Sequence, residues 1–136
     1  MNPIIYYKKR IRYKYTLHAP YQYETGIKDV YFVNDYLNLD LNGRLTIAKK
    51  FAWDGPSGPV IDTRNFMRAS LVHDALYQIL RESPDMKDRD GFRKKADKIL
   101  RSICRDEDMS GLRSTWVYYA VRLFGRGRAR PELLHT

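Results

Sequence analysis

Residues 63–83 read TRNFMRASLVHDALYQILRES, and this stretch decides the fold because its apolar residues recur with the period of an α-helix. Thr63 or Asp62 can cap the start of this helix, and we expect it to end near Ser83, before Pro84. The residues that fall on its inner side are Phe66, Ala69, Ser70, His73, Leu76, Tyr77 and Leu80. This side therefore contains an imidazole and a phenol, two polar groups that require partners when they are buried.

Two more helices are predicted after the first. A charged turn from Asp85 to Gly91 separates the first helix from the second. A third helix is expected from about Ser110 to Phe124, and Gly125 can end it. The buried stripe of the second helix is made by Phe92, Ala96, Ile99, Leu100 and Ile103. Residues 63–125 thus form a helical part that begins with an antiparallel helix hairpin.

The first 50 residues carry the period of two that is typical of strands. Residues 11–17 alternate between apolar and polar or charged side chains, and residues 30–33 predict a further strand. Two alternating runs flank the turn pair Asn42-Gly43, which predicts a hairpin. The apolar residues of these runs are Leu37, Leu39, Leu41, Leu45 and Ile47. We therefore expect residues 1–50 to form a small antiparallel β-sheet.

Between the two parts, residues 51–62 contain the segment WDGPSGP, in which glycine permits unusual dihedral angles and proline fixes φ. We expect an irregular loop there, and a mobile basic tail over residues 126–136. The order of sheet, loop and three helices predicts an α+β fold. A chain of 136 residues has room for a single domain, residues 1–136, with one core.

The chain is strongly basic, with 25 Lys and Arg residues against 16 Asp and Glu residues and a net charge of +9. Such a field attracts the phosphates of nucleic acid or of an anionic membrane, and charge alone does not choose between them. Many of the cations lie in two runs, residues 8–14 and 122–130, which are equally compatible with a solvated surface. The hydrophobic fraction of 43% excludes a disordered chain.

The single cysteine, Cys104, excludes an intramolecular disulfide and a zinc site of the cysteine type. This use of cysteine indicates a reducing compartment. Residues 1–20 lack the apolar core of a signal peptide, and no stretch approaches the ~18 apolar residues of a membrane span. We therefore expect no signal peptide and no transmembrane segment.

His73, Asp74 and Asp97 make the candidate site. At 1.5 Å per residue, His73 lies ~15 Å before the turn and Asp97 ~10 Å after it, so an antiparallel hairpin brings them nearly level. An aspartate level with a histidine can accept its N–H and orient it as a general base. Asp74 is rotated by about 100°, and we expect it to bind a cation together with carbonyl oxygens of the loop.

Each of these residues also has a purely structural interpretation. His73 and Asp74 can be buried polar groups that hydrogen-bond Asp97 and the loop, because such groups must be paired. Tyr77 can be a core residue with a bonded hydroxyl, and Trp53 is more typical of a core lid over the loop than of a ligand platform. Asp54 is the better candidate in the loop for contact with the histidine or with a metal.

The order of a glycine-containing loop, His-Asp-x-x-Tyr on one helix and an aspartate on the next resembles secretory-type phospholipase A2, especially its short viral versions without disulfides. The resemblance covers about a third of the chain. It implies that His73 is the base that activates water, with Tyr77 and Asp97 as its support. It also implies calcium as a cofactor, with ligands at Asp74, Gly55 and Gly58. The loop lacks that family's glycine run, and the N-terminal sheet has no counterpart there.

Four blocks in order, WDGPSGP, SLVHDALY, KKADKIL and VYYAVRLFG, resemble the phage- and prophage-associated domain-of-unknown-function family 1353 over nearly the whole chain. This resemblance implies a viral or prophage origin and a shared fold, without an activity. It places the protein in the host cytoplasm or in the virion.

Together the two resemblances favour a small phage- or prophage-encoded hydrolase that acts on an ester or amide of a lipid or of the cell envelope, with an anionic membrane as partner. One alternative is a non-catalytic virion, lysis or host-takeover protein that binds a virion or host protein, in which the same residues are structural. Another is a basic protein that binds nucleic acid through its termini, for which affinity must fall steeply with salt.

Overall fold

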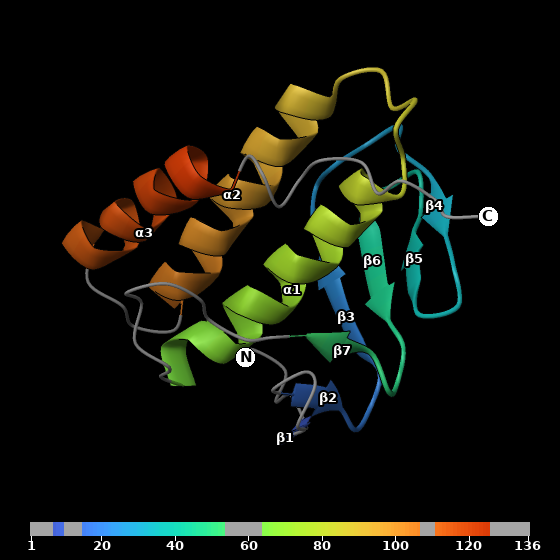
Figure 1. Cartoon of the computed structure of the whole chain (residues 1–136), viewed down its shortest axis with the longest axis horizontal. Coiled ribbons are helices and arrows are strands. Elements are labelled where there is room, and N and C mark those ends of the chain that lie inside the picture. The colour runs from blue at the N-terminus through green and yellow to red at the C-terminus, as the bar shows by residue number, and fades with distance from the viewer. Residues whose placement is uncertain (1–6, 10–14, 54–63, 107–110, 126–136) are drawn as a thin grey trace. The chain divides into compact units, whose positions relative to one another are not determined.

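The computed structural model describes residues 7–9, 15–53, 64–106 and 111–125 and shows antiparallel strands followed by three helices (Figure 1). The predicted α+β order is therefore confirmed. The chain divides into two compact units, residues 1–62 and residues 63–136. The expected single domain stays a prediction. The expected helix cap at residues 62–63 and the basic tail at 126–136 lie outside the described residues.

The described residues of the first unit form two antiparallel sheets rather than the one expected. Their strands are β1 (Tyr7–Lys9), β2 (Tyr15–Leu17), β3 (Tyr21–Glu24), β4 (Phe32–Val33), β5 (Leu37–Leu39), β6 (Arg44–Ile47) and β7 (Ala52–Trp53). The larger sheet has the order β3-β6-β5-β4, and the smaller one the order β1-β2-β7. Strand β7 lies at the start of the segment in which we expected a loop. It pairs with β2 through Tyr15 and Trp53, which are far apart in sequence.

The predicted hairpin is present as β5 and β6, but its turn begins earlier than expected. The carboxylate of Asp40 accepts the N–H groups of Asn42 and Arg44 at 2.9 and 3.0 Å, so the chain turns from Asp40 onward. Leu41, expected to continue the buried alternation, is instead 57% exposed in this turn. Gly43 has a φ of +94°, a conformation that glycine adopts without strain.

The described part of the second unit contains α1 (Arg64–Arg81), α2 (Arg89–Asp106) and α3 (Gly111–Phe124). Helix α2 packs against both α1 and α3 (Figure 1). The turn between α1 and α2 is fixed by the Arg89 guanidinium, which donates to the carbonyl oxygens of Leu80 at 2.7 Å and Ser83 at 2.5 Å. The predicted apolar stripe of α2 is buried as expected, and its inner face also contains Arg93, Asp97 and Cys104. Of these, Arg93 and Asp97 are charged and belong to the site described below.

Candidate functional site

The candidate site is centred on the carboxylate of Asp97, which is 0% exposed on the inner face of α2. Its Oδ1 lies 2.7 Å from Nε2 of His73 and accepts the Tyr77 hydroxyl proton at 2.7 Å. Its Oδ2 accepts from Nη1 of Arg122 at 3.0 Å and lies 3.6 Å from Nη1 of Arg93. All three helices therefore contribute to one buried polar network.

Helix geometry explains why these residues meet. His73 and Tyr77 are four residues apart on α1, so they lie on the same face one turn apart, and their ring centroids are 4.2 Å apart. The hairpin of α1 and α2 then brings Asp97 level with both rings. A buried carboxylate without partners would cost several kcal/mol, which the network offsets by giving each oxygen at least one donor.

The bond to Asp97 fixes which nitrogen of His73 is available. A carboxylate only accepts, so Nε2 carries the proton that it donates to Asp97. In the neutral ring, Nδ1 then holds the lone pair. The carboxylate of Asp74 stands on that side, with its Oδ1 4.0 Å from Nδ1. His73 thus has a fixed nitrogen toward Asp97 and a basic nitrogen toward Asp74.

Tyr77 acts as a permanent donor in the network. Burial raises the pKa of its phenol well above the usual range, and the charge of Asp97 and the hydrogen bond to it raise this pKa further. Nη1 of Arg93 lies 3.4 Å from the Tyr77 oxygen and opposes this shift. Because its pKa is raised, the phenol keeps its proton and donates it to Asp97 even at an alkaline pH at which an ordinary tyrosine ionises.

Arg93 and Arg122 join the network although the sequence patterns do not predict them as site residues. The guanidinium of Arg93, 8% exposed, also donates to the last carbonyl oxygens of α3, those of Val121 at 3.4 Å and Arg122 at 3.3 Å. A cation at a helix C-terminus is favourable because of the helix dipole. The position of Arg93 four residues before Asp97 is the sequence signal that could have revealed it.

The remaining predicted site residues, Trp53, Asp54, Gly55 and Gly58, belong to the first unit. Trp53 is buried in the first unit, where its ring centroid lies 5.6 Å from that of Tyr15 and 6.5 Å from that of Phe51. Asp54, Gly55 and Gly58 lie outside the described residues. Within the described ranges, no group of three or more His, Cys, Asp or Glu side chains could hold a metal ion.

The fold and this network define an α+β protein with a buried His-Asp-Tyr-Arg centre. Its chain belongs to the family described as "protein of unknown function (DUF1353)", whose profile matches residues 15–121. That range includes His73, Asp74, Tyr77 and Asp97. No curated protein and no solved structure matches the chain. Among the described helices, none is long and apolar enough to cross a membrane.

Proposed function

We propose that this protein is a hydrolase in which Nδ1 of His73 takes a proton from water. The observation that carries the proposal is the 2.7 Å hydrogen bond from Nε2 to Asp97, because it leaves Nδ1 as the basic nitrogen. A base held by a carboxylate in this way is the arrangement of general-base catalysis. The adjacent carboxylate of Asp74 gives the same side of the ring a negative charge.

The proposed reaction balances with these groups alone. Water loses a proton to Nδ1 as its oxygen attacks the carbonyl carbon of an ester or amide, and Asp97 stabilises the imidazolium that forms. The tetrahedral intermediate then breaks its bond to the leaving group, which takes the proton from Nδ1. Tyr77 and Arg122 touch Asp97 rather than the reacting atoms, so we assign them a positioning role.

For the substrate, we propose an ester or amide of a lipid or of the cell envelope. The net charge of +9 favours an anionic surface, and the His-Asp-x-x-Tyr arrangement resembles phospholipase A2. The resemblance to phage and prophage proteins would place such an enzyme in infection, in the host cytoplasm or the virion. The net charge and the two resemblances support this choice of substrate, and all three rest on the sequence.

Calcium is given no step in this reaction. Asp74 is the one predicted ligand within the described residues, whereas calcium takes six to eight oxygen ligands. A contribution of calcium is a separate proposal, tested by assaying hydrolysis after chelation and after addition of calcium or magnesium. The proposal is supported if calcium, but not magnesium, restores the rate of hydrolysis after chelation and if Asp74→Asn abolishes this recovery. Equal rates of hydrolysis in all conditions contradict it.

A second candidate function is a non-catalytic virion, lysis or host-takeover protein. Both oxygens of Asp97 accept hydrogen bonds, from His73 and Tyr77 on α1 and from Arg122 on α3, and His73 is only 5% exposed, which is also the pattern of a structural clamp. In that case His73 holds α1 against α2 and removes no proton from water.

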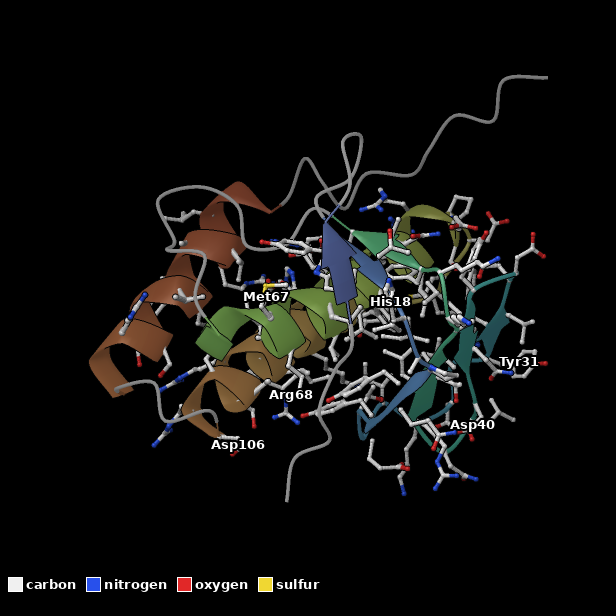
Figure 2. The ribbon with its side chains drawn as sticks, turned by 90° about the horizontal axis from the view of Figure 1, so that it is seen from below. His18, Tyr31, Asp40, Met67, Arg68 and Asp106 are labelled. Atoms are coloured by element: carbon white, nitrogen blue, oxygen red, sulfur yellow. The ribbon has the colours of Figure 1, made fainter. Side chains whose placement is uncertain are left out.

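One experiment separates the two functions. His73→Gln and the control His18→Gln, which changes an exposed histidine of the first unit (Figure 2), are assayed on glycerophospholipids and on nitrophenyl esters. We expect His73→Gln to lose about 100-fold or more in rate while the control keeps it. Thermal melting of the same proteins is measured in parallel. Equal rates in both variants contradict the hydrolase, and no hydrolysis by the unaltered protein, with a lower melting temperature for His73→Gln, favours the clamp.

A further inference from the structure

The outward face of α2 is a basic stripe, defined here by Lys94, Lys98, Arg101 and Arg105. At 100° per residue, these four side chains fall within about 60° of one another around the helix. The first and last are about 16 Å apart along the axis, at 1.5 Å per residue. Lys94, Lys98 and Arg105 are exposed, and Arg101 is half-buried. Lys95, also exposed, adds a fifth cation beside the stripe.

The second half of the stripe borders a hollow between α2 and α3. Its lining consists of Lys98, Arg101, Ser102, Arg105, Asp106 and Tyr118. Asp106, at the C-terminal end of α2 (Figure 2), is the one carboxylate among these six residues. Three cations, a hydroxyl and an aromatic ring therefore surround a concave surface.

Arg101 contributes both a contact to the aromatic ring and a buried hydrogen-bond donor to this hollow. Its guanidinium carbon lies 5.9 Å from the centroid of the Tyr118 ring, a distance at which a cation is attracted to the ring face. Its Nε is buried and has no hydrogen-bond partner within the described part of the chain. A buried donor without a partner costs free energy, and an acceptor oxygen of a ligand in the hollow would satisfy it.

We propose that this hollow and the basic stripe bind single-stranded nucleic acid. The cations would contact successive phosphates, since ~16 Å accommodates on the order of three to five phosphates of one strand. Tyr118, backed by Arg101, would provide the ring on which a base stacks. The lining of the hollow favours this ligand over a lipid surface, because it contains no aliphatic side chain that could enter the acyl region.

This site is separate from the His73 network. None of its six lining residues donates to or accepts from Asp97 in the hydrogen bonds of the network. Binding can therefore be tested in variants that keep the network, and its failure would leave the proposed hydrolase untouched.

The test measures fluorescence anisotropy of a labelled oligothymidylate with the full chain over a range of salt concentrations. The stripe variant Lys98→Gln/Arg101→Gln/Arg105→Gln is compared with Lys28→Gln/Lys49→Gln/Lys87→Gln, which removes the same charge from exposed positions elsewhere. We expect the stripe variant to reduce the slope of log Kd against log salt by about 2, at ~0.7 per phosphate contact. The control should keep the slope. The double variant Lys98→Gln/Arg105→Gln, with both changes at exposed positions, serves if the triple variant does not fold.

Aromatic variants test the stacking step. Tyr118→Leu should weaken binding by roughly 5- to 150-fold, whereas Tyr118→Phe, which keeps the ring, should not. Tyr31→Leu, at a 66% exposed tyrosine of the first unit, is the matched control. Equal loss in the stripe and control charge variants overturns the proposal. A second result would also overturn it. In that result the protein does not bind the oligonucleotide but does bind phosphatidylcholine vesicles that contain phosphatidylserine, and the stripe variant loses this vesicle binding.

Discussion

Helix α2 has buried, paired charges on its inner face and exposed cations on its outer face. Arg93 and Asp97 point inward and are 8% and 0% exposed, whereas their sequence neighbours Lys94 and Lys98 are exposed. Each inner charge has several partners within hydrogen-bond or ion-pair distance. The outer cations face water. A charge that leaves water must be paired, whereas one that stays in water has no such requirement.

This difference separates stability from binding. The inner charges are committed to one another, so removing one leaves the others buried without compensation. The outer charges contribute little to folding and can change with little effect on it. Selection on a ligand can therefore act on the stripe without disturbing the network one residue away in sequence.

The largest effect is expected from Asp97→Ala. It removes the acceptor of His73 and Tyr77 and the counter-charge of Arg122, so we expect the free energy of unfolding to fall by about 3–5 kcal/mol. Urea unfolding followed by circular dichroism measures the change.

The neighbouring variant Lys98→Ala is the control for Asp97→Ala. Lys98 is exposed, and alanine keeps the helix propensity high, so this change should alter the free energy of unfolding by no more than about 0.5 kcal/mol. If the two variants change the free energy of unfolding by similar amounts, whether both large or both small, the buried and the exposed charges of α2 do not differ in their contribution to stability.

A smaller loss is expected from Gly125→Ala, which disturbs the network without removing a charge. A methyl group there would lie 2.6 Å from the Tyr77 hydroxyl oxygen and 2.5 Å from the Val121 carbonyl oxygen, which accepts from Arg93. Overpacking of this kind costs about 1–3 kcal/mol. The change is again measured as the free energy of unfolding in urea.

Gly111→Ala is the matched control for Gly125→Ala. Gly111 begins α3 with nothing within 4 Å of the position of an added methyl group. Alanine is the better helix former, so this change should be neutral or should stabilise by up to about 1 kcal/mol. If Gly125→Ala matches it, the close packing of Gly125 on Tyr77 is refuted.

The helix hairpin of the site can be predicted from the sequence because it depends on regular geometry. The rise per residue of an α-helix suffices to place His73 and Asp97 nearly level, and the two side chains meet at 2.7 Å. Arg93 has only its spacing of four residues from Asp97 as a signal, and Arg122 has none, because an arginine is ordinarily assigned to water. Arg122 in particular reaches Asp97 only through the packing of α3 on α2, which local sequence does not encode.

The strands show the same limit. The hairpin of β5 and β6 follows from a local alternation and a turn, and its prediction is confirmed apart from the place where the turn begins. Strand β3 is not predicted although Tyr21 and Tyr23 alternate with polar residues, because a run of four residues is a weak signal. The division into two sheets depends on the pairing of β2 with β7, a contact between distant parts of the chain.

The smallest expected effect is on the pH dependence of stability, through Tyr77. Its pKa is raised in the folded state, whereas the unfolded chain has a tyrosine pKa of about 10. Above pH ~10 the unfolded phenol loses its proton while the native one keeps it, so this contribution to stability is present below pH ~10 and is lost as pH rises. At pH ~11 the loss is about 1 kcal/mol. Tyr77→Phe should lack this component of the decline, whereas Tyr119→Phe, at an exposed position, should retain it. The measurement is the free energy of unfolding of the three proteins between pH ~8 and ~11, and parallel curves for all three would show that the Tyr77 hydroxyl is not held in the network as a protonated donor.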